Sequence, residues 1–88
     1  MIKASMFRGI GYKCAMLYYN NEEWPRAIKE FEQLVDATDP HIYEMLSKCY
    51  LKAVNQAKYE ENINLAISSY ETVGEHDKAE RLRQNIKH

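Results

Sequence analysis

Apolar residues recur every three or four positions in five segments of this chain, and short polar stretches separate the segments. That spacing places apolar side chains on one face of an α-helix, which has about 3.6 residues per turn. The pattern predicts an all-α fold of about five helices, packed as antiparallel hairpins in a single domain, residues 1–88. The expected helices span about residues 3–19, 25–36, 40–53, 63–73 and 76–87. Their expected inward faces include Ile10, Leu17, Val35 and Val73.

Several helix boundaries carry sequence signals. Pro25 suits the first turn of a helix, where the missing N–H has no partner to lose, and Asp39 followed by Pro40 predicts a capped helix start. Gly74 predicts a C-terminal stop. Residues 55–62 show no clear apolar period, and we interpret them as a loop or an irregular helical extension.

A pattern of small and aromatic residues occurs twice along the chain. Ala15 and Ala27 in the first half correspond to Ser47 and Ala66 in the second half. Ala15 and Ser47 are 32 positions apart, whereas Ala27 and Ala66 are 39 positions apart. The second half therefore holds seven extra residues between its two helices, and we place them in an inserted loop near residues 55–62.

This pattern resembles the tetratricopeptide repeat (TPR), a helix pair of about 34 residues with small and aromatic residues at set positions. The first unit spans about residues 8–39 and the second about residues 40–74 with the inserted loop. Residues 74–82 resemble the turn and second helix of such a unit once more. The matching positions are Ala15, Tyr18, Ala27, Phe31 and Leu34 in the first unit, and Tyr43, Leu46, Ser47, Tyr50, Ala66, Tyr70 and Val73 in the second.

The resemblance implies a short right-handed superhelix in which the first helix of each unit lines a concave groove. It also implies which positions face that groove. They are Gly9, Tyr12, Met16, Tyr19 and Asn20 in the first unit, and His41, Glu44, Lys48, Leu51 and Lys52 in the second. The candidate partner-binding residues among them are Tyr12, Met16, Tyr19, Glu44, Lys48, Leu51 and Lys52.

Stacked helical hairpins form surfaces that hold another chain. Some members of the TPR family bind a terminal carboxylate through a clamp of Lys and Asn. Here Tyr12, Met16 and Glu44 stand at clamp positions, which argues against such a clamp. We expect a scaffold-type protein–protein interaction module whose groove binds an apolar or helical peptide segment.

Self-association is an alternative function. Repeat arrays need about three units and polar ends. In this chain Ile2, Met6, Phe7 and Ile10 have no preceding helix to cover them. A homodimer would bury these residues, and a position within a longer TPR array would explain them equally well.

Charge and cysteine usage narrow the class of partner. The chain carries 12 Lys and Arg against 13 Asp and Glu, evenly spread, so the basic face of a nucleic-acid binder is missing and an RNA-binding helical repeat is less expected. No apolar segment approaches the roughly 20 residues of a membrane span. Cys14 and Cys49 fit no metal or redox spacing, which predicts reduced core cysteines and a cytoplasmic protein.

No residue pattern indicates an active site. There is no Gly-rich phosphate loop and no metalloprotease helix signature. His41 and Glu44 lie one helical turn apart, but a bridged metal site needs a second such pair, and the sequence contains none. We therefore expect no enzymatic activity, no cofactor and no metal.

We interpret Trp24, next to Pro25, as a hydrophobic staple onto Ile28 or as a partner contact.

Overall fold

Five helices and no strand make up the described part of the protein, which confirms the predicted all-α fold. The computed structural model describes the backbone of residues 4–36 and 38–86, with side chains from residue 9 onward. The helices are α1 (Ala4–Asn20), α2 (Trp24–Glu32), α3 (Pro40–Lys52), α4 (Gln56–Thr72) and α5 (His76–Ile86). None of these helices, within the described ranges, has the length and apolar composition that crossing a membrane requires.

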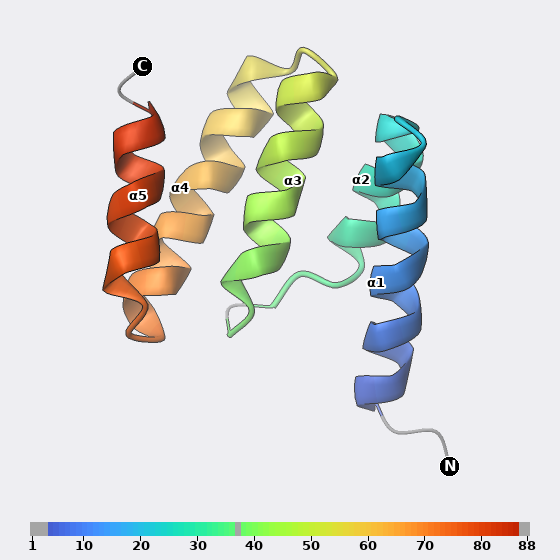
Figure 1. The fold of residues 1–88 in the computed structure, drawn as a ribbon, viewed down its shortest axis with the longest axis horizontal. Coiled ribbons are helices and arrows are strands. Elements are labelled where there is room, and N and C mark those ends of the chain that lie inside the picture. The colour runs from blue at the N-terminus through green and yellow to red at the C-terminus, as the bar shows by residue number, and fades with distance from the viewer. Residues whose placement is uncertain (1–3, 37, 87–88) are drawn as a thin grey trace.

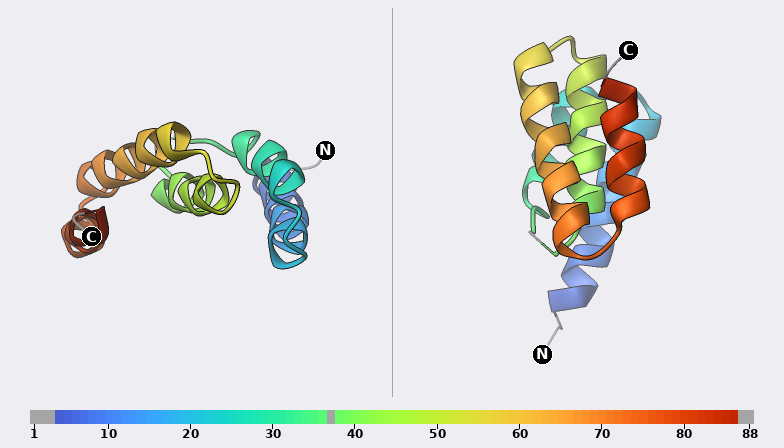
Figure 2. Two further views of the ribbon diagram at one scale, coloured as in Figure 1. Left: turned by 90° about the horizontal axis from the view of Figure 1, so that it is seen from above. Right: turned by 90° about the vertical axis from the view of Figure 1, so that its left-hand side faces the viewer.

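The helices pack in chain order, so that each one contacts the next (Figure 1). Seen from above in Figure 2, they form an arc, with α1, α3 and α5 along its inner side and α2 and α4 along its outer side. The arc measures 43 × 30 × 17 Å. Its inner side is therefore a concave surface to which three helices contribute.

The turns that end α1, α3 and α4 share one hydrogen-bond geometry. In each turn a residue with left-handed backbone follows the helix, and the next helix begins two positions later. The left-handed residues are Glu22, Val54 and Gly74, with φ of 60°, 59° and 85°. The next N–H then bonds the carbonyl five residues earlier, with N···O distances between 2.7 and 2.9 Å, and these carbonyls belong to Tyr18, Tyr50 and Tyr70. This arrangement is the Schellman motif, which satisfies the last carbonyls of a helix.

Residues 55–62 were expected to form a loop or an irregular helical extension, and the loop is wrong. Residues 56–62 extend α4 at its start as regular helical turns, and the helix begins at Gln56. Asn55 caps the helix, and its side-chain oxygen accepts a 3.2 Å hydrogen bond from the Lys58 N–H. Seven residues make about two helical turns, so the insertion lengthens α4 without rotating its buried face. The apolar period is interrupted at Asn62, which is buried and donates its amide to the Lys58 carbonyl over 2.9 Å.

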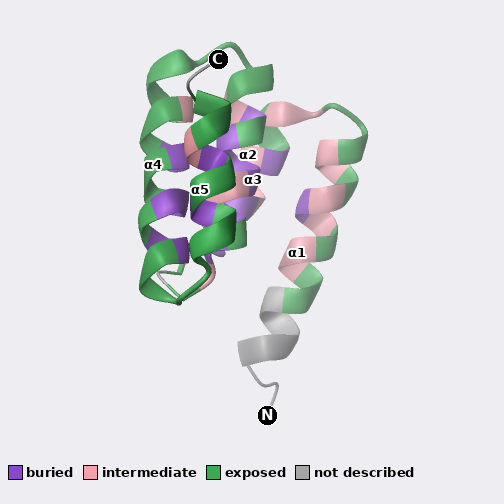
Figure 3. Ribbon diagram, turned by 60° about the vertical axis from the view of Figure 1, so that its left-hand side comes forward, coloured by how far each residue is buried: buried purple, intermediate pink, exposed green. Residues whose placement is uncertain are grey.

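Two clusters of buried side chains hold the hairpins together (Figure 3). The first cluster joins α1, α2 and α3 and contains Ala15, Ala27, Phe31, Leu34, Ile42, Met45, Leu46 and Cys49. The second joins α4 and α5 and contains Ile63, Ala66, Ile67, Tyr70, Ala79 and Leu82. Ala27 and Ala66 are fully buried, as the repeated pattern predicts. The small residues of the repeated pattern thus allow the helices to pack closely against aromatic rings in both clusters.

Some residues expected on inward faces are exposed. α2 ends at Glu32 rather than near residue 36, so Val35 lies in the exposed connection to α3. Val73 follows the last residue of α4 and is also exposed. Ile10 and Leu17 lie on a side of α1 that no other described helix covers. The apolar pattern of the sequence therefore includes more positions than the helices bury against one another.

Candidate functional site

Two of the hollows that the described residues form lie on the inner side of the arc. The larger has a volume of about 660 Å³ and is called the α3–α5 groove; it is lined by Glu44, Ser47, Lys48 and Leu51 of α3, Tyr59 and Ile63 of α4, and Arg81, Leu82 and Asn85 of α5. The smaller, called the α1 hollow, has a volume of about 320 Å³ and is lined by Tyr12, Lys13, Met16, Leu17 and Asn20. Both are of a size that accommodates side chains of a bound molecule.

The α3–α5 groove has an apolar floor. Ile63 of α4 and Leu82 of α5 are both buried, and the ring of Tyr59 lies half-buried beside them. The hydroxyl of Ser47 faces the groove but already donates a 2.6 Å hydrogen bond to the carbonyl of residue 44, so it leaves no unsatisfied donor there. Leu51 stands at the mouth of the groove with 49% of its surface exposed. The floor therefore continues outward onto an accessible leucine.

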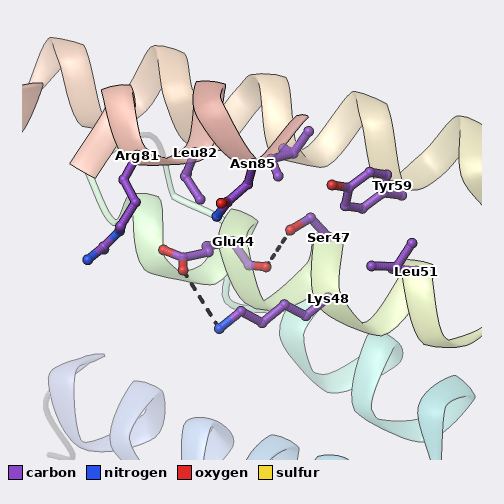
Figure 4. A pocket seen from close by; sticks show the side chains of 9 residues that line it. Glu44, Ser47, Lys48, Leu51, Tyr59, Arg81, Leu82 and Asn85 are labelled. Atoms are coloured by element: carbon purple, nitrogen blue, oxygen red, sulfur yellow. Dashed lines mark hydrogen bonds and ion pairs between the residues drawn. The ribbon is translucent and has the colours of Figure 1, made fainter. Parts of the chain in front are cut away.

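The rim of the groove is polar, and its two sides come from α3 and α5 (Figure 4). On α3, Glu44 lies between two partners. The Tyr70 hydroxyl donates a 2.6 Å hydrogen bond to Glu44 Oε1, and Lys48 Nζ lies 3.7 Å from Glu44 Oε2. On α5, Arg81 and Asn85 stand one turn apart, and Arg81 forms no ion pair with any residue in the described ranges. The α5 rim thus presents a cation that has no acidic side chain within ion-pair distance among the described residues.

The Tyr70 hydroxyl stays protonated at ordinary pH. Burial raises the pKa of Tyr70 above its usual value, and the hydrogen bond to Glu44 and the negative charge of that carboxylate raise this pKa further. A neutral phenol can donate to a carboxylate, whereas a phenolate cannot. Tyr70 therefore holds Glu44 against the wall that α4 provides.

The α1 hollow lies beside a contact between α1 and α3. The Tyr12 hydroxyl and Nε2 of His41 are 2.8 Å apart, and the Tyr12 ring meets Phe31 edge-on with ring centres 6.1 Å apart. Met16 is half-buried against the first core cluster. Both Tyr12 and Met16 are therefore partly used in packing, and each also presents a face to the hollow.

The candidate binding residues are divided between the two hollows. Glu44, Lys48 and Leu51 line the α3–α5 groove, whereas Tyr12 and Met16 line the α1 hollow. The single groove expected from the sequence is thus two separate depressions on one concave side.

Two further candidates line neither hollow. Lys52 is exposed at the last residue of α3. Tyr19 packs against Trp24, with ring centres 5.3 Å apart and ring planes at 75°. Trp24 therefore joins α2 to α1 through an aromatic contact. The two rings meet edge to face, which is a favoured arrangement for aromatic pairs.

Sequence reasoning missed the part of the groove that α4 and α5 provide. Tyr59 and Ile63 lie four positions apart, within the segment that was expected to be a loop or next to it. Arg81 and Asn85 also lie four positions apart, beside the buried Leu82. The four-residue spacing was a usable signal for a shared helix face. The juxtaposition of α5 and α3 across a groove, however, depends on the three-dimensional arrangement.

No group of three or more His, Cys, Asp or Glu side chains within the described ranges is placed to hold a metal ion. His41 pairs with Tyr12, while Glu44 pairs with Tyr70 and Lys48, so the two side chains are directed to different partners. The two cysteines, Cys14 and Cys49, are free. Burial raises the pKa of the Cys49 thiol to about 11, which keeps it in its unreactive neutral form.

Chemically, the groove offers an apolar floor for a side chain, a cation at one rim and a hydrogen-bonded carboxylate at the other. No protein family matches this chain, and neither a curated protein nor a solved structure matches it. The geometry of the groove is therefore the basis for assigning a function.

Proposed function

We propose that this protein is a non-enzymatic protein–protein interaction module that binds an apolar or helical segment of its partner in the α3–α5 groove. The observation that carries this proposal is Leu51, a half-exposed leucine at the mouth of a groove whose floor is Ile63 and Leu82. A partner side chain inserted there would remove apolar surface from water, which is worth about 25 cal/mol per Å². Buried apolar anchors surrounded by a polar rim are typical of interface centres.

The remaining candidate residues would extend the contact along the inner side of the arc. Tyr12 and Met16 offer the second hollow, and Lys48 and Lys52 are exposed along α3. Tyr19 would contribute through the end of α1 that it shares with Trp24. A long partner segment could contact several of these residues, as concave surfaces of helical repeats allow.

We also propose that the chain is a TPR-like repeat and that it is cytoplasmic. The same turn geometry after α1 and α3, the first helices of the two units, supports the repeat, because each turn has a tyrosine at the same position. The placement of α1 and α3, the first helices of the two units, on the inner side supports it as well (Figure 2). α5 also lies on the inner side, so it takes the place of a first helix rather than that of the second helix expected for residues 74–82. The free thiols of Cys14 and Cys49 suit a reducing compartment.

A selection from random peptides tests the proposed function. A displayed library of peptides of about 14 residues, enough for about four helical turns, is selected against the full chain. The selected peptides are then measured against two variants, Leu51→Ser and Leu65→Ser. Leu65 is the matched control because it is 41% exposed on α4 and does not line the groove.

We expect Leu51→Ser to weaken binding of the selected peptides by about tenfold or more, while Leu65→Ser leaves it within about twofold. Circular dichroism confirms that both variants remain helical. Equal binding by the two variants, or a selection that yields no binder, contradicts the proposed function.

Self-association is a second candidate function, and two exposed apolar residues of α1 favour it. Ile10 and Leu17 are 61% and 62% exposed, and they lie seven positions apart on one side of the helix. Ile2, Met6 and Phe7, which led to the same expectation from sequence, lie outside the residues whose side chains are described. Size-exclusion chromatography with light scattering tests this candidate: a dimer that Leu17→Asp converts to monomer supports it, and a monomer at high concentration contradicts it.

A further inference from the structure

The lining of the two hollows is locally basic, although the net charge of the whole chain is −1. Lys13 lines the α1 hollow, whereas Lys48 and Arg81 line the α3–α5 groove, so α1, α3 and α5 each contribute one cation. Among the described residues that line either hollow, Glu44 alone is acidic. The charge facing a ligand therefore differs in sign from the charge of the chain.

The carboxylate of Glu44 is already engaged. It accepts the 2.6 Å hydrogen bond from Tyr70 on one oxygen and faces Lys48 at 3.7 Å on the other. Arg81, on the opposite rim, has no acidic partner within the described part of the chain. The groove thus presents one unpaired guanidinium and one half-exposed ammonium at a long ion-pair distance, next to an apolar floor.

We propose that the occupant of the α3–α5 groove is an acidic amphipathic peptide segment. This inference rests on the proposed function, and it adds the chemical class of the partner. Apolar side chains of the segment cover Leu51 and the floor, while a neighbouring carboxylate pairs with Arg81. A guanidinium binds a carboxylate through two parallel hydrogen bonds, and the amide of Asn85, one turn away on α5, can donate to the same group.

Charge complementarity favours an acidic peptide over a nucleic acid. Phosphate backbones are bound by surfaces on which several cations act together, whereas this groove has two and also carries the carboxylate of Glu44. The floor formed by Ile63, Leu82 and Leu51 matches aliphatic side chains, which nucleic acids lack. The test must therefore distinguish binding of an acidic peptide from binding of a nucleic acid.

The test uses three designed peptides with blocked ends, so that no terminal charge contributes. Each has about 14 residues and leucines spaced three and four positions apart, which form one helical face. The flanking positions carry Glu in the first peptide, Gln in the second and Lys in the third. Fluorescence anisotropy of labelled peptides then gives the Kd for the full chain at low and at high salt.

We expect the Glu peptide to bind about tenfold or more tightly than the Gln peptide, and the difference to shrink as salt screens the charges. Arg81→Glu should abolish this preference and favour the Lys peptide. The matched control is Lys29→Glu, which makes the same charge reversal at an exposed position of α2 outside both hollows. Lys29→Glu should leave the preference intact.

The failures are distinguishable. Equal affinity for the Glu and Gln peptides, with binding still lost in Leu51→Ser, overturns the acidic partner and leaves the proposed function standing. Absence of binding by all three peptides at about 1 mM overturns both. Displacement of the Glu peptide by a short single-stranded uridine RNA at lower concentration overturns the peptide partner in favour of a nucleic acid.

Discussion

The hydroxyl of Tyr70 on α4 donates a 2.6 Å hydrogen bond to Oε1 of Glu44 on α3, and this bond links the second core cluster to the rim of the α3–α5 groove. Tyr70 is buried among the residues that join α4 to α5. Glu44 faces the groove. A single side chain thus contributes both to the stability of the stack and to the orientation of a carboxylate at the candidate site.

Replacing Tyr70 with Phe should lower the free energy of unfolding by about 1 to 3 kcal/mol, because the ring is kept while a hydrogen bond to a charged group is lost. Urea unfolding followed by circular dichroism measures the change. Tyr59→Phe is the control, since the Tyr59 hydroxyl makes no hydrogen bond within the described ranges, and it should change stability by less than about 0.5 kcal/mol. Equal stability of Tyr70→Phe and the unmodified chain contradicts the assigned role of the bond.

The buried thiol of Cys49 should make the protein less stable at alkaline pH. Burial raises its pKa from 9.0 to about 11, so the folded state keeps the thiol neutral while the unfolded chain ionises it near pH 9. Unfolding therefore releases a proton, and the free energy of unfolding should fall by about 2 to 3 kcal/mol as pH rises through that window. Below pH 9 this contribution is fully present.

Two variants isolate the Cys49 effect. Cys49→Ala should make the decline in stability between pH 9 and about pH 10 shallower. Part of the decline should remain, because the pKa of Tyr70 is also raised in the folded protein and this residue already ionises partly in the unfolded chain over the same range. Cys14→Ala is the control, because Cys14 is only half-buried, and the decline should remain. An unchanged slope in Cys49→Ala contradicts the prediction.

Val54 occupies a backbone conformation that suits glycine. Its φ is 59°, and a β-branched residue in this left-handed region carries a strain of about 1 to 2 kcal/mol. Its side chain is 90% exposed, so removing it costs little packing. Val54→Gly should therefore raise the free energy of unfolding by up to about 1 kcal/mol, less than the strain because glycine is freer in the unfolded chain.

The equivalent turn after α4 provides the reciprocal experiment. Gly74 has φ of 85°, with open space where a Cβ would lie, so Gly74→Ala changes backbone strain without a steric clash. Gly74→Ala should lower the free energy of unfolding, measured by urea unfolding, by about 1 kcal/mol. If Val54→Gly destabilises the protein and Gly74→Ala does not, the prediction is contradicted. Left-handed backbone strain would then not determine how substitutions at these two positions affect stability.

The helices and their packing were predictable because the residues that determine them repeat. Ala27 and Ala66 occur at equivalent positions of the two halves, and both are fully buried. The start of α4 was not predictable from the apolar period, because Asn62 places a polar amide at a buried position and satisfies it within the helix. A polar residue that bonds its own backbone leaves no sign of burial in a hydropathy pattern.

The candidate site was only partly predictable for a different reason. Lys48 and Leu51 follow from the helical face of α3. Arg81 follows from no pattern, because its importance comes from lying opposite Glu44 and from having no acidic partner in the described ranges. Tyr19 shows the reverse case, since an aromatic residue expected on the groove is paired with Trp24.

The α3–α5 groove, on the inner side of the arc, is the proposed binding site for a partner segment. The most direct measurement is a titration of the isotope-labelled full chain with a selected peptide, followed by amide chemical shifts in NMR spectra. The account predicts the largest shifts at Glu44, Lys48 and Leu51 on α3 and at Arg81 and Asn85 on α5. Largest shifts on the outer helices, around Lys29 on α2 or Leu65 on α4, would contradict it.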